Sequence, residues 1–219
     1  MTYWLTYGAL GAFVGFIAGL LGIGGGGVIV PVLVIVFGMQ AVPHEHVMHI
    51  ALATAMACIV FTSVSSFREH HARGAVDWQI FRRITPGIVL GSLLGSFIAT
   101  LLPTNVLKIV FASFLLYVAI QILIDRKPKP SRQLPGTAGM FSAGGFIGAV
   151  SALVGIGGAA LAIPFMIWSN VTMRSAIGTS SAIGFPIALA SVLGYIGSGW
   201  RVAGLPAPVR RGRRLPVRG

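Results

Sequence analysis

The chain has 219 residues, of which 55% are hydrophobic and only 9% are charged. A soluble domain carries about 25% charged residues, so this composition excludes an ordinary soluble protein and indicates an integral membrane protein. The net charge of +12 does not indicate nucleic-acid binding, because the basic residues lie mainly between apolar runs, where they orient membrane helices. The single cysteine, Cys58, excludes a disulfide within the chain.

The first apolar run covers residues 8–37 and contains no charged residue. A helix of that length would measure about 45 Å, which exceeds the roughly 30 Å hydrocarbon core of a bilayer but is too short for two spans. Five of the six residues from Gly22 to Gly27 are glycines, and Pro31 follows. Each glycine costs about 1 kcal/mol relative to alanine inside a helix, and proline removes a backbone donor. We therefore predict a helix that enters the membrane, breaks at the glycines and resumes.

Six spanning segments are predicted along the chain, and the first and fifth are interrupted by glycines. In chain order they cover residues 8–37, 46–66, 84–102, 106–124, 138–168 and 175–197. The basic segments 67–83 and 125–133 predict cytoplasmic loops, because Lys and Arg are enriched on that side. Loops 38–45 and 169–174 are then expected outside. The amino terminus is expected in the cytoplasm, provided that each broken segment crosses fully.

The glycine motif occurs twice, with an offset of 133 residues. Gly155-Ile156-Gly157-Gly158 repeats residues 22–25, and Pro164 repeats Pro31. On this offset, residues 13–31 and 146–164 are identical at eight of nineteen positions. In the helix that follows each motif, Ala51, Thr54 and Ala57 match Ala176, Thr179 and Ala182 at an offset of 125. Paired, glycine-interrupted apolar segments in the two halves of a chain point to a transporter binding site.

These features predict an all-α polytopic membrane protein with two internal repeats, each opening with a glycine-broken transmembrane helix. We divide the chain into a first four-helix repeat (1–124), a cytoplasmic basic linker (125–137), the first two helices of a second repeat (138–200) and a basic tail (201–219). About six spans are present of an expected eight. The repeat offset puts the other two between residues 209 and 249, where no apolar span exists. Six of the sixteen Lys and Arg residues follow Trp200, so we expect a truncated or out-of-frame tail.

The glycine breaks are the candidate anion site. The amino terminus of a half-helix presents unpaired N–H groups and about +0.5 of an elementary charge, and glycines let a ligand approach closely. The candidate residues are Gly24, Gly25, Gly26, Gly27, Gly157 and Gly158, with hydroxyl groups from Thr54, Thr179 and Ser180. The alternative role for glycine is close helix packing, and for a hydroxyl a bond to its own helix. We expect the packing role for three stripes of glycines, which are Gly15-x3-Gly19, Gly87-x3-Gly91-x3-Gly95 and Gly144-x3-Gly148.

The titratable residues favour no catalytic or metal site. The four acids are Glu45, Glu69, Asp77 and Asp125, and all lie in predicted loops or at helix ends. Intramembrane carboxylates normally mark proton relays and cation sites, so their absence disfavours a cation pump. His44, His46 and His49 lack the spacing of the zinc-protease motif, and we interpret them as membrane-interface residues rather than metal ligands. No cofactor is expected, and no serine lies beside a base that would suggest a hydrolase.

Three motifs together carry a resemblance to a known family. They are Gly15-x3-Gly19-x2-Gly22-x-Gly24-Gly25-Gly26-x4-Pro31, its second copy Gly148-x6-Gly155-x-Gly157-Gly158-x5-Pro164, and Gly178-Thr179-Ser180. Over residues 8–200 the chain resembles the sulfite exporter TauE/SafE family, also called the toluene sulfonate uptake permeases. The resemblance implies a bacterial inner-membrane permease of seven or eight helices that moves sulfur-containing organic or inorganic anions.

We therefore predict a multi-pass secondary transporter for a small anion such as sulfite, a sulfonate or another small organic acid. Its expected partners are this anion and the lipid bilayer, with no nucleic acid, and homo-oligomerisation is left open. The sequence also leaves open a passive anion channel, or an inactive truncated fragment or membrane scaffold.

Overall fold

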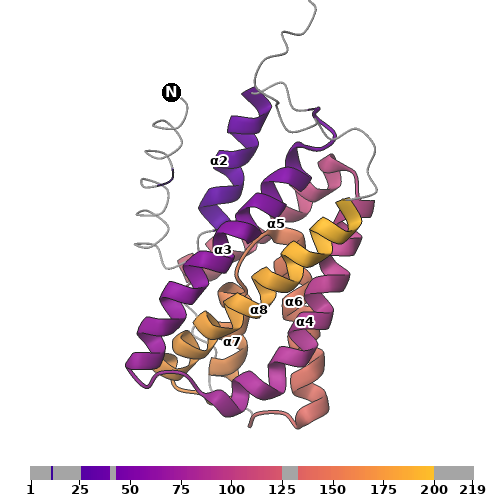
Figure 1. Cartoon of the computed structure of the whole chain (residues 1–219). Coiled ribbons are helices and arrows are strands. Elements are labelled where there is room, and N and C mark those ends of the chain that lie inside the picture. Colours follow the sequence, from indigo (N-terminus) through magenta and orange to yellow (C-terminus); the bar gives the residue numbers. More distant parts are fainter. Residues whose placement is uncertain (1–10, 12–25, 40–42, 125–132, 200–219) are drawn as a thin grey trace, which may run out of the picture.

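The computed structural model describes residue 11 and residues 26–39, 43–124 and 133–199. Within these ranges the chain is helical, with turns between the helices and no β-strand (Figure 1). The helices are α2 (Gly26–Met39), α3 (Val47–Ala72), α4 (Trp78–Leu101), α5 (Thr104–Ile124), α6 (Thr137–Val154), α7 (Ala159–Trp168) and α8 (Met173–Gly199). The predicted all-α fold class is confirmed.

Five of these helices, α3, α4, α5, α6 and α8, are long and apolar enough to cross a membrane. The other two, α2 and α7, have 14 and 10 residues and form the later halves of the two broken segments. The second, third, fourth and sixth predicted spans each correspond to one long helix. Half of the first predicted span lies outside the described residues. The chain is a multi-pass membrane protein.

The turn between α3 and α4 is shorter than the sequence suggested. We predicted a loop over residues 67–83, but α3 continues to Ala72 and α4 already begins at Trp78. Asp77 explains the early start of α4, because its carboxylate accepts hydrogen bonds from the N–H groups of Gln79 (2.9 Å) and Ile80 (3.1 Å). Basic side chains mark a membrane boundary but do not end a helix.

Helices α4 and α6 run parallel along a seam of glycines, here called the glycine seam. A β-carbon added at Gly87, Gly91 or Gly95 would overlap the backbone of Phe141, Gly145 or Ala149, respectively. From the α6 side, Gly144 and Gly148 lie equally close to the backbone of Ile84 and Ile88. Small residues let membrane helices approach to backbone contact, so the packing role predicted for these two stripes is confirmed.

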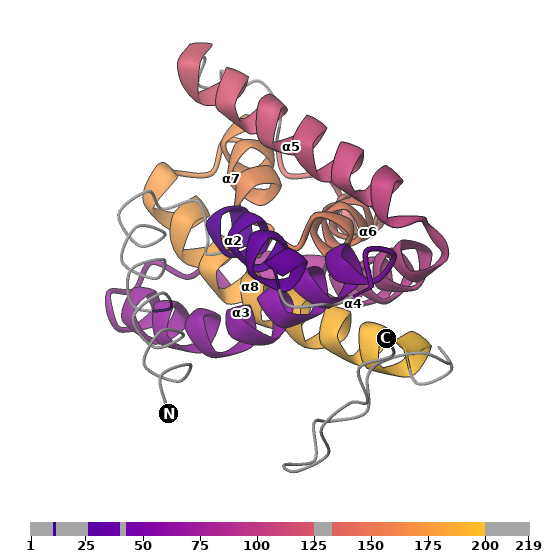
Figure 2. The same cartoon turned by 90° about the horizontal axis from the view of Figure 1, so that it is seen from above.

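Helix α8 also runs parallel to α4. Near its start, the Arg174 guanidinium donates a hydrogen bond to the Arg73 carbonyl oxygen at 2.6 Å. Near its end, Gly194 lies against the side chain of Ser96 in α4. The starts of α4, α6 and α8 therefore lie together with the turn 73–77, at what we call the basic end of the bundle (Figures 1 and 2).

Helix α3 runs in the opposite direction to α8. Its last residues precede the turn 73–77 beside the start of α8, and Gly184 of α8 lies next to Ser63 in α3. At the other end of the bundle, His49 of α3 fixes the end of α4. Its Nε2 lies 3.0 Å from the Ala99 carbonyl oxygen and 3.1 Å from that of Leu102. The Ala99 carbonyl oxygen also accepts from the Leu102 N–H at 3.3 Å, whereas the Leu102 carbonyl lies beyond the last turn of α4, where intrahelical donors are absent.

The connection between α7 and α8 corrects the predicted topology. Loop 169–174 was predicted outside, opposite to loop 67–83, but Arg174 contacts Arg73 at the basic end. Helix α6 starts at that same end, because Gly87 in the early part of α4 meets Phe141 in the early part of α6. The broken segment 137–168 therefore enters and leaves at one end of the bundle. The placement of the two loops on opposite sides is wrong, because the segment does not cross fully.

Candidate functional site

The second glycine motif breaks the helix where the sequence predicted. Helix α6 ends at Val154, α7 begins at Ala159, and the backbone φ angles are +74° at Gly155 and +79° at Gly158. Side chains are rarely tolerated at such angles, so glycine is strongly favoured at both positions. The N–H groups of Gly155 and Ile156 donate to the Ser151 carbonyl oxygen at 2.9 and 3.1 Å, which closes the end of α6.

The break also reverses the chain direction near the middle of the bundle. A β-carbon on Gly158 would lie 3.4 Å from the Ser151 hydroxyl oxygen and 3.7 Å from a methyl group of Ile147, both in α6. A β-carbon on Gly157 would lie 3.4 Å from Ile59, in the centre of α3. The α6–α7 turn, residues 155–158, therefore sits halfway between the two ends of the bundle.

The two glycine motifs meet at this turn. Gly26 is the first described residue of α2 and is buried, and a β-carbon on it would overlap the Gly155 carbonyl oxygen. The amino-terminal ends of α2 and α7 thus lie at the same depth. Among the candidate residues, Gly26, Gly157 and Gly158 come together here, and Gly27 follows as the second residue of α2. Gly24 and Gly25 lie outside the described residues.

Backbone N–H groups are the polar groups that this turn offers. Within the part of the chain that the structure describes, the N–H groups of Gly157, Gly158 and Ala159 form no backbone hydrogen bond. The Gly158 carbonyl oxygen, in contrast, accepts from Leu161 (3.2 Å) and Ala162 (2.9 Å). This pattern is expected at the start of a helix, where the first N–H groups have no intrahelical acceptor. The start of α7 therefore has a positive partial charge.

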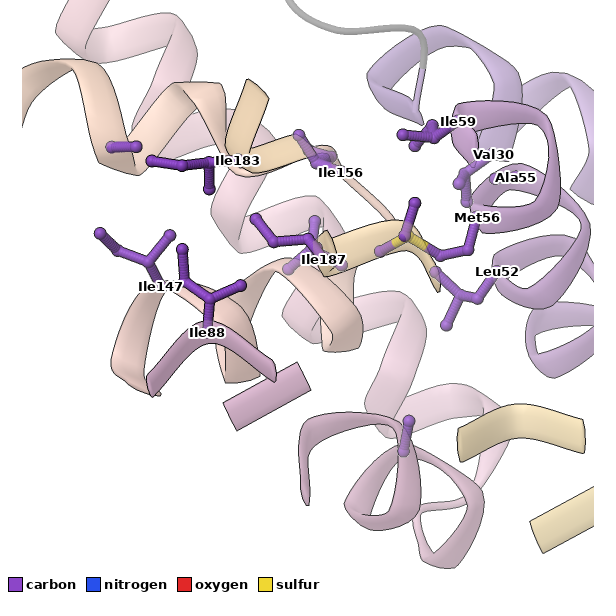
Figure 3. Close-up of a cluster of buried hydrophobic side chains, with 14 of the residues drawn as sticks. Val30, Leu52, Ala55, Met56, Ile59, Ile88, Ile147, Ile156, Ile183 and Ile187 are labelled. Atoms are coloured by element: carbon purple, nitrogen blue, oxygen red, sulfur yellow. The ribbon is translucent and has the colours of Figure 1, made fainter. Parts of the chain in front are cut away.

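The side chains around the turn are aliphatic. Figure 3 places Val30, Leu52, Ile59, Ile147, Ile156 and Ile187 around it, from α2, α3, α6, the turn itself and α8. All six are at most 4% exposed, and none is charged. Such surroundings have a low dielectric constant, in which hydrogen bonds to an anion are stronger than in water. The site is chemically a set of backbone donors enclosed by aliphatic side chains.

The candidate hydroxyl groups are not gathered at the turn. The Thr179 Oγ1 atom accepts a hydrogen bond from the Asp77 N–H at 2.9 Å, at the basic end. Ser180 donates to the Ile177 carbonyl oxygen of its own helix at 2.9 Å. Thr54 lies in the early part of α3, toward the opposite end from Thr179. Ser180 therefore bonds to its own helix, as the alternative interpretation described, whereas Thr179 joins α8 to the α3–α4 turn, a role that neither interpretation described.

Tyr195 contributes to the site in a way that sequence reasoning missed. Its buried hydroxyl donates to the Ala152 carbonyl oxygen at 2.9 Å, one turn before the α6–α7 turn. This contact ties α8 to the end of α6, whose last carbonyls lack helical partners. A tyrosine in an apolar run gives no sign of its partner, because the partner is a backbone atom 43 residues away.

Two buried serines were also not predicted from the sequence. Among the described side chains, the hydroxyl oxygens of Ser92 in α4 and Ser191 in α8 are buried without a hydrogen-bond partner. Ser92 faces Gly148 across the glycine seam, where a β-carbon on the glycine would lie 2.9 Å from its hydroxyl oxygen. Both serines belong to helices that pack near α6, so the interior of the bundle contains hydroxyl groups that no described residue uses.

Comparisons with known proteins agree with this architecture. A family model for the sulfite exporter TauE/SafE matches residues 7–209, nine residues beyond Trp200. A probable membrane transporter protein of Haemophilus influenzae is 33% identical over 192 residues, covering 87% of this chain and 73% of that protein. The probable membrane transporter protein YdhB of Bacillus subtilis is 28% identical over 193 residues, covering 85% of this chain and 76% of its own. No solved structure matches the chain significantly.

These relatives support a membrane transporter, and the family model covers nearly the whole sequence. The residues it spans include both glycine motifs, the α6–α7 turn and helix α8. The chain therefore belongs to the sulfite exporter TauE/SafE family.

Proposed function

We propose that the chain is a secondary transporter for a small anion, such as sulfite, a sulfonate or another small organic acid, bound where α2 and α7 begin. The observation that carries the proposal is the contact between Gly26 and Gly155. It brings the amino-terminal ends of two half-helices to the same depth, halfway through the bundle. Each end adds a positive partial charge, so their combined field favours one anion without any cationic side chain.

The unpaired N–H groups supply the chemistry of binding. An oxyanion accepts hydrogen bonds from several backbone donors at once, and the donors at Gly157, Gly158 and Ala159 have no competing backbone acceptor among the described residues. Non-helical backbone at membrane depth is tolerated only inside protein or beside a water-filled cavity. A transient hydrated site at the turn meets that condition and also gives the anion its access.

The arrangement of α3 and α8 supports alternating access. The sequence pairs these helices as equivalent members of two repeats, and they run in opposite directions. We infer inverted repeats, in which the broken segment 137–168 turns back at the midplane and α2 begins at the same depth. In transporters of this kind the site lies at the repeat interface, and one repeat rocks against the other to expose it.

We further propose that the chain lies in the bacterial inner membrane with its basic end in the cytoplasm. The described basic end has five arginines, Arg68, Arg73, Arg82, Arg83 and Arg174. Cytoplasmic loops carry this excess of positive charge. With loop 169–174 at the basic end, Arg174 lies on the same side of the bundle as the other four arginines.

Flux measurements on the full chain in liposomes test the proposal. Protein-dependent uptake of sulfite or a sulfonate, saturating with concentration and showing counterflow, is expected of a transporter. Flux without saturation or counterflow would indicate a passive anion channel. If no tested anion moves in protein-containing liposomes, the transport proposal fails in favour of an inactive chain or scaffold.

The site is tested separately with Gly158→Leu, which should abolish flux because a side chain at a φ of +79° overlaps Ile187 and displaces the N–H groups of the turn. Gly38→Leu is the matched control, because Gly38 is exposed near the end of α2 and nothing lies within 4 Å of its β-carbon position. Equal flux by the Gly158 variant and the wild-type chain would remove the turn from the transport path.

A further inference from the structure

The basic end carries a cluster of aromatic rings that joins α3 to α4. Phe67 stacks on His71 with ring centroids 5.6 Å apart, and Trp78 lies edge-on to both, at 5.7 Å from Phe67 and 5.4 Å from His71. Phe81 meets Trp78 edge-on at 5.4 Å. Trp78 is 39% exposed. Partly exposed tryptophan is typical of the membrane–water interface, so the cluster marks the depth of the lipid headgroups.

Three exposed arginines flank these rings. Arg68 follows Phe67 on α3, and Arg82 and Arg83 follow Phe81 on α4. None of the three forms an ion pair with a described residue, whereas Arg73 pairs with Glu69 through Nη2 at 2.6 Å. We call Arg68, Arg82 and Arg83, together with the aromatic cluster, the basic–aromatic surface.

Charge is concentrated at this end of the bundle. The described residues of the basic end include five arginines and two acids, Glu69 and Asp77, which leaves three positive charges. At the opposite end, Glu45 and Lys108 cancel. The described charge is therefore asymmetric along the bundle, and the excess lies on the basic–aromatic surface.

The depth of Arg82 and Arg83 favours an anionic partner. They are the fifth and sixth residues of α4, a helix long enough to cross a membrane, and they lie about 6 Å further along it than Trp78. A guanidinium below the interface is unfavourable unless it is paired, and a long side chain reaches back to the headgroups. Phosphate suits this group, because guanidinium binds phosphate oxygens through two parallel hydrogen bonds.

We propose that the basic–aromatic surface binds the headgroups of anionic phospholipids. Arg82 and Arg83 on α4 and Arg68 on α3 extend their side chains to the phosphate, and Trp78 lies about one turn of α4 nearer the basic end, at the depth of the headgroups. A bound headgroup then bridges α3 and α4 beside the turn 73–77. Because the Asp77 N–H in this turn donates to Thr179 of α8, the lipid also stabilises the position of α8.

Thermal unfolding of the full chain in neutral detergent tests the proposal. Phosphatidylglycerol should raise the unfolding temperature more than phosphatidylcholine, and 0.5 M salt should remove most of the difference, because it screens charge. The Arg82→Gln/Arg83→Gln double variant should lose at least half of the difference. Lys108→Gln, an exposed cation on α5 near the other end, should keep it.

Several outcomes would overturn the proposal. The first is an equal rise in unfolding temperature with phosphatidylglycerol and with phosphatidylcholine. The second is a double variant that keeps the full difference between the two lipids. The third is a loss of that difference in Lys108→Gln as large as in the double variant. A full shift produced by inorganic phosphate or by a short oligonucleotide would identify a soluble anion rather than lipid as the occupant. If the double variant does not fold, Arg68→Gln replaces it, with a partial loss expected and an unchanged shift contradicting the proposal. Anion flux is not the readout, so failure of the transport proposal leaves this result interpretable.

Discussion

The glycine seam and the α6–α7 turn use the same residue for opposite purposes. Along the seam, Gly87, Gly91 and Gly95 recur every fourth residue within an unbroken helix and bring α4 against α6. At the turn, Gly155 and Gly158 adopt positive φ angles and end one helix before another begins. The seam glycines act because they lack a β-carbon, so a neighbouring helix can approach closely. The turn glycines act because their backbone can adopt positive φ angles, which lets the chain reverse direction.

This difference teaches how to separate packing from function in a glycine-rich membrane protein. A seam glycine lies on a regular helix, so replacing it changes the distance between two helices. A turn glycine holds an irregular backbone, so replacing it changes where N–H groups point. We therefore expect seam substitutions to act on stability, and turn substitutions to act on transport more than on stability.

The largest effect is expected for Gly91→Leu in the glycine seam. The new side chain would overlap the backbone of Gly145, which cannot move aside as a side chain can, so α4 and α6 must separate. Overpacking costs about 1–3 kcal/mol and more where backbone must shift. The free energy of unfolding, measured in detergent, should fall by more than 3 kcal/mol. Gly197→Ala, whose β-carbon would meet nothing within 4 Å, is the control. Equal stability of the two variants would show that close packing at the glycine seam does not stabilise the protein.

A smaller loss of stability, but a complete loss of transport, is expected for Gly158→Ala. A left-handed backbone costs a side chain about 1–2 kcal/mol, and the new β-carbon also presses on the Ile187 δ-methyl group. Gly74→Ala is the matched control, because Gly74 has a φ of +64° in the α3–α4 turn with nothing within 4 Å. Gly74→Ala should lose only the stability that backbone strain costs, and Gly158→Ala should lose more because of the overlap with Ile187, but only Gly158→Ala should lose flux. Loss of flux in both would mean that backbone strain alone explains it.

Thr179→Val and Thr54→Val compare two residues that occupy equivalent positions in the sequence repeat. Valine at 179 leaves the Asp77 N–H without its acceptor, which we expect to cost about 1.5 kcal/mol of unfolding free energy. Valine at 54 removes no hydrogen bond seen among the described residues, so the change should stay within about 0.5 kcal/mol. Chemical unfolding of both variants in detergent provides the measurement. A larger loss at Thr54 would assign that hydroxyl an unrecognised structural partner.

Among the variants that remove a hydrogen bond, the smallest effect is expected for Tyr195→Phe. The variant keeps the ring and loses the hydrogen bond to the Ala152 carbonyl oxygen, at a cost of about 1 kcal/mol. Flux should decrease while remaining measurable, because the end of α6 is held less firmly beside the turn. Tyr117→Phe on α5 is the control, since its ring is 50% exposed and its ring contact with Phe114 is retained. A stability loss as large in the control would show that the Ala152 contact is unimportant.

Part of the fold could be predicted from the sequence, because helix length and helix breaks depend on residues that are close together in the chain. Apolar length identified the long helices, and the cluster at Gly155–Gly158 marked the break, since each glycine weakens a helix without help from neighbours. The spacing of Gly87, Gly91 and Gly95 likewise predicted a packing stripe. The topology failed at loop 169–174, because charge counting assumes that every apolar segment crosses. The 10-residue α7 has a length of about 15 Å and only returns to the basic end.

The sequence by itself determined that this is a multi-pass helical membrane protein of the TauE/SafE family with two glycine motifs, because composition, helix length and motif spacing are local properties. Only the tertiary structure decided that the second motif reverses the chain, that Gly26 meets Gly155, and that Thr179 holds the α3–α4 turn instead of joining the glycines. Those facts depend on which helices become neighbours. Neighbours are selected by close packing between segments far apart in the chain, and no local pattern records that selection.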